Sequence, residues 1–118
     1  MIRREQRFAD GSLSAVEHFD GEVKSGDAEY WYRSGRKKAE GRFADGLFTG
    51  TWTWWRDNGE LLQQGAFVAG EQHGLWRRWH DTGALMDEGE WVHGKRSGEW
   101  THYDKLGEVR RVVTHPAR

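Results

Sequence analysis

The sequence predicts an all-β fold: an elongated, single-sheet antiparallel meander of β-hairpin repeats with a period of 24 residues. Fifteen of the 16 glycines recur on four positions of that period, and Gly21 alone stands one residue from its expected position. Aromatic residues recur with the same spacing, as Trp52, Trp76 and Trp100 show. Such frequent glycines disfavour helix, because each costs roughly 1 kcal/mol in a helix interior.

The chain of 118 residues fits one repeat domain. Terminal repeats are usually atypical, and both ends of this chain depart from the pattern. The three full units are residues 26–49, 50–73 and 74–97, the degenerate capping unit is 2–25, and the partial C-terminal unit is 98–118.

Each unit should contain two short strands, such as "TWTWWRD", which is rich in the strand-favouring residues Thr and Trp, and "ELLQQGAFV". Asn58-Gly59 alone would suggest a type I′ turn, but Thr82 and Leu106 occupy the Asn58 position in other units and disfavour positive φ. We therefore expect a type I turn followed by a left-handed glycine, which forms a bulge. The second break, as in "FADGLFTG", should be a longer turn. Roughly eight to ten strands would make a sheet about 40–45 Å long.

Composition limits the possible functions. Only 36% of residues are hydrophobic but 14% are aromatic, so apolar burial should come mainly from rings. The chain has no cysteine, which removes thiol chemistry and the usual zinc spacings. Its six histidines share no ligand spacing, so we expect no metal and no cofactor. A net charge of -1 gives no general attraction to nucleic acid. No apolar run could span a membrane and the start does not resemble a signal peptide, so a cytoplasmic location is expected.

The stretch "GEWVHGKRSGEW" at residues 89–100 resembles the MORN repeat, whose pattern G-x-[W/F]-x-x-G-x-x-x-G also fits residues 41–50 and 65–74. Trp stands where the commonest MORN unit has a further glycine, and in this the chain is similar to bacterial MORN-variant repeats. The resemblance covers roughly residues 26–108. It implies a β-hairpin solenoid that acts as an interaction module. Some eukaryotic members are linked to phospholipids or scaffolding, and bacterial variant-repeat proteins are often named antitoxins or immunity proteins.

The repeat separates expected core residues from expected binding residues. Trp52, Trp76 and Trp100 recur unchanged, which favours a core role over a stacking platform. Strict strand alternation places Trp54 on the face of Trp52 and sends Trp55 to the other face, unless a bulge reorients one of them. Two positions change from unit to unit and should form an exposed polar and aromatic patch, which is either a solvated face or a surface that binds a partner. The predicted binding residues are Tyr30, Trp54, Arg78 and His102 in one row, and Tyr32, Arg56 and His80, continued by Asp104, in the next.

No catalytic constellation is evident, so the chain is predicted not to be an enzyme. The leading hypothesis is a protein-binding module, in its most specific form a bacterial antitoxin or immunity-type inhibitor that occludes a toxin or effector through one sheet face. One alternative is a binder of carbohydrate or another small ligand, which would stack on Trp54 and Trp55. Another is a self-associating or lipid-associated scaffold. Against edge pairing between copies, the last strand carries Arg110 and Arg111 and is followed by Pro116.

Overall fold

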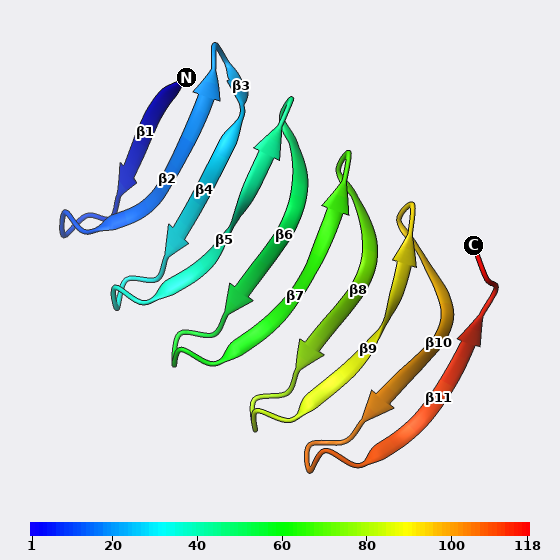
Figure 1. Ribbon diagram of the computed structural model, residues 1–118. Helices are drawn as coiled ribbons and strands as arrows, with labels where there is room; N and C mark the ends of the chain where they lie inside the picture. The colour runs from blue at the N-terminus through cyan, green and yellow to red at the C-terminus, as the bar shows by residue number, and fades with distance from the viewer.

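A computed structural model describes residues 1–118 and confirms the predicted all-β fold. Its strands form one antiparallel sheet in the order β1-β2-β4-β5-β6-β7-β8-β9-β10-β11, and the short strand β3 pairs only with β2. The termini lie at opposite ends of this meander (Figure 1). The strands are β1 (Ile2–Arg7), β2 (Leu13–Asp20), β3 (Val23–Lys24), β4 (Gly26–Trp31), β5 (Lys37–Ala44), β6 (Leu47–Trp55), β7 (Leu61–Val68), β8 (Glu71–Trp79), β9 (Leu85–Val92), β10 (Lys95–Tyr103) and β11 (Val109–His115).

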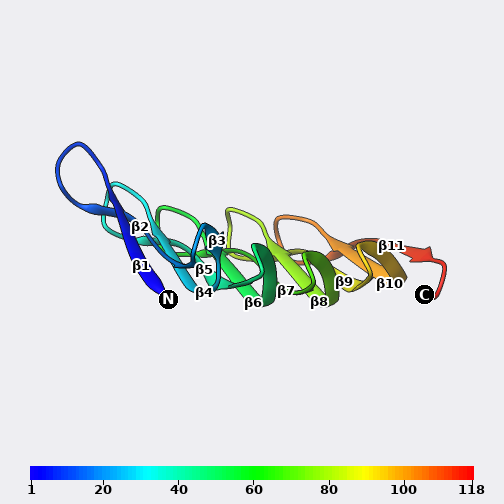
Figure 2. The ribbon, with the colours of Figure 1, turned by 90° about the horizontal axis from the view of Figure 1, so that it is seen from above.

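The sheet is a single layer. The molecule measures 44 × 32 × 14 Å, and the longest of these dimensions agrees with the expected length of about 40–45 Å. Seen from above, the strands follow one another from the N-terminal to the C-terminal end with no second layer over either face (Figure 2). Burial therefore has to come from side chains packed along the sheet itself.

The turns at Gly35, Gly59, Gly83 and Gly107 have the predicted bulged geometry. In the β6–β7 hairpin the Gly59 N–H donates to the Arg56 carbonyl (2.9 Å), and the Arg56 N–H donates to the Glu60 carbonyl (2.7 Å). Gly59 has a φ of 90°, whereas Asn58 is not among the residues of positive φ. A type I turn followed by a left-handed glycine accounts for this pattern.

The prediction of a longer second turn is wrong. Strand β5 ends at Ala44 and β6 begins at its partner Leu47, so only Asp45 and Gly46 form the loop. Both have positive φ, 51° and 79°, which is the type I′ geometry. The same tight turn recurs at Ala69-Gly70 and His93-Gly94. The glycine four residues later, Gly50 in this unit, is not part of a turn but lies inside β6.

Each of these in-strand glycines marks a break in register. Arg42 on β5 pairs with Thr49 on β6, but Glu40 pairs with Thr53, so residues 50–52 together face Gly41. Gly50 has a φ of 67°, which a side chain would resist. The extra length of β6 bends the strand locally and turns the Trp52 side chain over its neighbour.

The indole of Trp52 lies directly on Gly41. A Cβ on Gly41 would come within 2.1 Å of the ring, so only glycine fits there. The ring Nε1–H of Trp52 donates to the Arg42 carbonyl (3.0 Å), which satisfies its one polar group. The same arrangement recurs with Trp76 on Gly65 and with Trp100 on Gly89.

These three Trp side chains are buried in the core, as predicted, and Trp52 is only 1% exposed. Each packs edge-to-face against the aromatic residue nine positions earlier in the chain. The ring centroids are 5.2 Å apart for Phe43–Trp52, 5.1 Å for Phe67–Trp76 and 5.7 Å for Trp91–Trp100. We call the side of the sheet that carries them the aromatic face. Rings thus replace the scarce aliphatic side chains as filler.

The structure explains why Gly21 stands one residue from the position that the period predicts. In the first unit the turn consists of Gly21 and Glu22, between the paired residues Asp20 and Val23. Gly21 has a φ of 65° and Glu22 is not among the residues of positive φ. A glycine at the first loop position is typical of a type II′ turn, whereas type I′ turns place it second. The first unit therefore uses a different tight turn at the same place.

Candidate functional site

The first predicted binding row lies on the aromatic face. Backbone pairing continues this row across the sheet, since each member is the register partner of the next. We call this line of residues the central row. It consists of Tyr30, Ala39, Trp54, Gln63, Arg78, Asp87, His102 and Arg111.

Trp54 is more enclosed than expected. Its ring lies between those of Trp52 and Trp76, with centroid separations of 5.8 and 5.9 Å. It is half-buried, as are Tyr30 and His102, whereas Arg78 is exposed. Of this row, which the sequence predicts to be exposed, Arg78 is exposed and the other three side chains are partly covered by their neighbours. Trp55 follows a register shift and contributes to none of the ring pairs around Trp52.

The second predicted row uses its polar atoms to join neighbouring hairpins. The Tyr32 hydroxyl donates to the Trp55 carbonyl (2.7 Å), and Arg56 Nη2 donates to the Trp79 carbonyl (2.9 Å). His80 Nε2 lies 2.8 Å from the Tyr103 carbonyl.

Each of these bonds spans 23 residues, so it connects equivalent places in successive units. In the last unit Asp104 instead accepts the N–H groups of its own turn at Leu106 and Glu108. The polar atoms of Tyr32, Arg56 and His80 are thus used in bonds between successive units.

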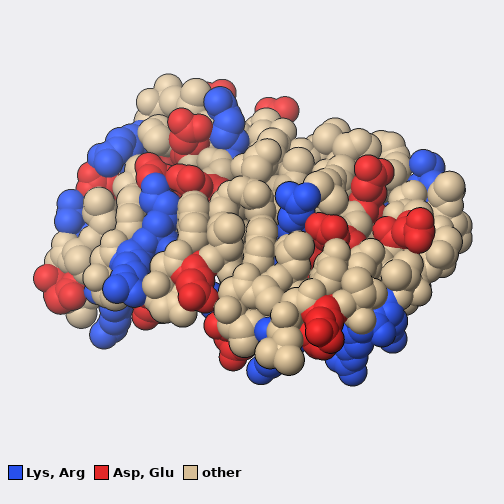
Figure 3. All heavy atoms as spheres, turned by 60° about the horizontal axis from the view of Figure 1, so that its bottom comes forward, with Lys and Arg blue, Asp and Glu red and all other residues tan.

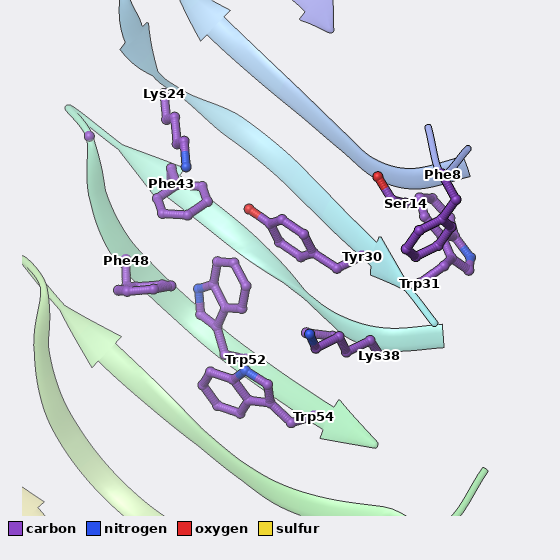
Figure 4. Close-up of a pocket in the computed structure, with 12 residues that line it drawn as sticks. Phe8, Ser14, Lys24, Tyr30, Trp31, Lys38, Phe43, Phe48, Trp52 and Trp54 are labelled. Atoms are coloured by element: carbon purple, nitrogen blue, oxygen red, sulfur yellow. The ribbon is translucent and has the colours of Figure 1, made fainter. Parts of the chain in front are cut away.

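A hollow of about 600 Å³ opens at the N-terminal half of the aromatic face. We call it the aromatic hollow. Figure 4 shows the rings of Tyr30, Phe43, Trp52 and Trp54 on one side of the strands, with Lys24 close to Phe43. The Lys24 ammonium is 5.0 Å from the Phe43 ring centroid. The volume of the aromatic hollow is within the range of small-ligand pockets, and its lining is mainly apolar.

A buried carboxylate holds one wall of the aromatic hollow in place. The Tyr30 hydroxyl donates to Glu17 Oε2 (2.5 Å), and the Lys24 ammonium lies 2.9 Å from the same oxygen. Burial opposes ionisation of Glu17, but these two hydrogen bonds outweigh it and hold its pKa below the usual value. Burial and the nearby carboxylate raise the pKa of Tyr30, so its hydroxyl remains a donor. The Tyr30 ring is thereby fixed in orientation.

A second hollow of about 360 Å³ lies at the C-terminal half, and we call it the charged hollow. Asp87, which is 1% exposed, accepts two bonds from Arg78: Nε to Oδ1 at 3.0 Å and Nη2 to Oδ2 at 2.5 Å. His102 Nδ1 lies 3.7 Å from the same carboxylate. The Arg96 guanidinium stacks 4.4 Å above the Trp100 ring.

The charges around His102 have opposing effects on its protonation. Burial lowers the pKa of His102, and Asp87 opposes this shift. Arg111, Arg96 and Arg78 lower the pKa further. The imidazole is therefore held in its neutral form to a lower pH than a free histidine.

Sequence reasoning missed Asp87 and Arg96, although the pattern that identified Trp54 would have found them. The position of Asp87 holds Ala39, Gln63 and Arg111 in other units. The position of Arg96 also varies, with Lys24, Phe48 and Gln72 as its equivalents. Positions that change from unit to unit therefore line both hollows.

Away from these hollows the surface carries both signs of charge. Acidic and basic side chains are interspersed on the side shown in Figure 3, and neither sign covers it alone. On the face opposite the aromatic face, Arg77 Nε pairs with Glu88 Oε2 at 3.0 Å. No group of three His, Cys, Asp or Glu residues is placed to hold a metal ion. The structure also contains no helix long and apolar enough to cross a membrane.

Two stretches, residues 48–69 and 72–93, match the family model described as MORN repeat variant. These two stretches are therefore similar to MORN-variant repeats. The two matches begin 24 residues apart, so they have the period of the glycines, and each covers one hairpin, β6–β7 or β8–β9. MORN repeats are generally protein- or membrane-interaction repeats and are generally non-catalytic. Among curated proteins, none matches the sequence.

Proposed function

We propose that this chain is a non-catalytic protein-binding module whose partner docks on the aromatic face. The observation that carries the proposal is a single-layer sheet with two hollows, one aromatic and one charged, on a face that no other element covers. The MORN-variant repeats support it, since repeats of this kind generally mediate interactions.

The residue types on this face favour protein binding. Trp, Tyr and Arg provide most of the strongest contacts at protein interfaces. Tyr30, Trp54 and Arg78 are each held by neighbours within the chain: Tyr30 by Glu17, Trp54 by two indoles and Arg78 by Asp87. Side chains that are already ordered lose less conformational entropy when a partner binds.

The most specific form of the proposal is an antitoxin or immunity-type inhibitor. Its partner would be a toxic protein or effector that the aromatic face occludes. Support for this form comes from the resemblance to bacterial MORN-variant proteins that bear such names. Occlusion by a rigid sheet face would require no chemistry from the chain, which agrees with the general absence of catalysis in MORN repeats.

The test compares two adjacent arginines that lie on opposite faces. The tagged protein is used to capture partners from its native lysate, in parallel with Trp54→Ala, Arg78→Glu and the control Arg77→Glu. We expect the first two variants to lose a partner that Arg77→Glu retains, because Arg77 lies on the face with Glu88. Thermal unfolding confirms that each variant is folded. A partner lost only with Arg77→Glu would show that the opposite face binds.

The inhibitor form has its own readout. The captured partner is expressed in a host cell, and growth is measured with and without the chain. Wild type should restore growth and Trp54→Ala should restore it less. A partner that is harmless when expressed alone would contradict the inhibitor form but not protein binding.

A carbohydrate remains the second candidate ligand, because the ring-lined aromatic hollow has a volume suited to a small molecule. Its stacking platform would be Tyr30 and Trp54, since Trp55 lies outside the ring cluster. A change of Trp fluorescence on titration with sugars that Trp54→Ala abolishes would favour this candidate over a protein partner.

A further inference from the structure

The charged hollow contains more positive charge than the chain neutralises. Arg78 is paired with the buried Asp87, but Arg96 and Arg111 have no carboxylate within 4.0 Å. The Arg96 guanidinium is instead held against aromatic rings, 4.4 Å from the Trp100 centroid and 5.6 Å from the Trp91 centroid. A guanidinium that is held in this way and unpaired is suited to bind an anion in bidentate geometry.

The environment of His102 supports this view of the hollow. Its ring is flanked by Asp87 from β9, Arg78 from β8, Arg96 on its own strand and Arg111 from β11. The arginines outnumber the single carboxylate, and they disfavour a proton on the imidazole. A negative group entering the hollow would reduce this repulsion.

The two hollows lie on one line across the sheet. Trp54 of the aromatic hollow is on β6, and Asp87 and His102 of the charged hollow are on β9 and β10, all in the central row. Three to four strand spacings of about 4.8 Å separate them, which gives roughly 14–19 Å. An extended peptide advances about 3.3 Å per residue, so about four to six residues would span that distance.

We infer that the charged hollow binds a carboxylate of the partner, and that the partner segment is an extended acidic peptide lying along the central row. An Asp or Glu of this segment pairs with Arg96 and Arg111, and an aromatic or large apolar side chain about four to six residues away enters the aromatic hollow. The inference rests on the proposed function, because it takes the partner to be a protein. A membrane surface is a poorer fit, because acidic residues are interspersed with the basic ones and the net charge is -1.

The test is selection from a displayed library of random 12-residue peptides against the full chain. Enriched peptides should carry Asp or Glu about four to six positions from Trp, Phe, Tyr or Leu. One such peptide is then synthesised and its affinity measured. Arg96→Glu combined with Arg111→Glu should weaken binding at least about tenfold, and Arg77→Glu, a single charge reversal on the other face, should not. If the double variant does not fold, the affinity of the peptide for the milder variant Arg96→Gln is measured in its place, and it too should be weaker than for the wild type.

The outcomes separate the inference from the proposed function. Peptides that need Trp54 but show no acidic preference would overturn the inference and leave protein binding on the aromatic face intact. A selection in which no binder depends on Trp54, Arg96 or Arg111 would contradict both. Vesicles containing phosphatidylserine are assayed in parallel. Vesicle binding that Arg96→Glu abolishes, without any enriched peptide, would assign the hollow to lipid headgroups and overturn the inference.

Discussion

At the scale of single residues, the fold depends on pairing each core indole with one glycine. The Trp76 ring rests on Gly65, and its Nε1–H donates to the Ala66 carbonyl at 2.9 Å. The glycine is therefore required by the space that the ring occupies, not by its own backbone, since Gly65 does not have positive φ. This distinguishes it from Gly59, which has open space around it but a φ of 90°.

This distinction predicts a strong dependence between two positions. Gly65→Ala would place a Cβ 2.0 Å from the Trp76 ring, so the indole must move and its hydrogen bond must break. We expect a loss of about 2–4 kcal/mol in the free energy of unfolding, measured by urea denaturation. In a Trp76→Leu background the space above Gly65 is free, so the same change should cost little.

The control is Gly59→Ala, whose cost arises from left-handed strain of about 1–2 kcal/mol. That cost should be the same with or without Trp76→Leu. Equal losses from Gly65→Ala in both backgrounds would mean that the indole does not dictate the glycine.

At the scale of the hairpin, two turn types alternate along the chain. Bulged type I turns close one end of each hairpin, and type I′ turns connect it to the next strand. In the type I′ turns the first loop residue has positive φ, and it is Asp45, Ala69 or His93. Ala69 has a φ of 49° and lacks the short polar side chain that makes this conformation more favourable for Asn or Asp.

Ala69→Asn should therefore stabilise the chain. It would create an Asn-Gly type I′ turn, and we expect a gain of about 0.5–1 kcal/mol in the free energy of unfolding. Leu106→Asn is the matched control, because it too creates an Asn-Gly pair, but Leu106 is not among the residues of positive φ. A gain from Leu106→Asn that equals the gain from Ala69→Asn would contradict the assignment of the two turn types.

The hairpins also show what the sequence could predict. The period, the strands and the bulged turn follow from the glycines and from the varied residues at the Asn58 position. The sequence does not reveal the type I′ turn, because the spacing of Gly46 and Gly50 predicts one longer loop, whereas Gly50 lies inside β6. Periodicity records that a glycine recurs but not whether a turn, a strand bulge or a neighbouring ring requires it.

The candidate site was predictable to a similar extent. Variation between units correctly singled out Tyr30, Trp54, Arg78 and His102 as one row, and the structure places them on one face. It could not separate this row from that of Tyr32 and Arg56, since bonds to the carbonyls of the next unit leave no trace in composition. The pairing of Arg78 with Asp87 was also out of reach, because it depends on the register of β8 and β9.

At the scale of the whole molecule, the aromatic face changes in character from one end to the other. Rings dominate the N-terminal half, and arginines enter the same positions in the C-terminal half, as from Trp54 to Arg78. The backbone and the core rings repeat, while other side chains that line the hollows, such as Trp54 and its equivalent Arg78, change from unit to unit. A regular scaffold can therefore present different chemistry at each unit without any change of fold.

The two edge strands of the sheet have no pairing partner on their outer side, and both carry positive charge. Strand β1 is exposed along its whole length and carries Arg3, Arg4 and Arg7, and β11 carries Arg110 and Arg111. Pairing β11 of one copy with β1 of another would place these like charges side by side. Positive charge at both edges thus disfavours growth of the sheet by addition of copies.

The period predicts that a whole unit can be removed without loss of the fold. Deleting residues 50–73 joins Thr49 to Gly74, and every later residue keeps its position in the repeat. Trp76 would then lie over Gly41 in place of Trp52, and no Cβ would obstruct it. We expect a folded monomer with a cooperative thermal transition at a lower temperature, because one hairpin and its interface are lost.

Deleting one residue fewer, 50–72, shifts Trp76 by one position and turns it toward the opposite face, so that variant should not fold. Circular dichroism and gel filtration of the two deletions decide the matter: if both fold equally well, the 24-residue register is not what holds the sheet together.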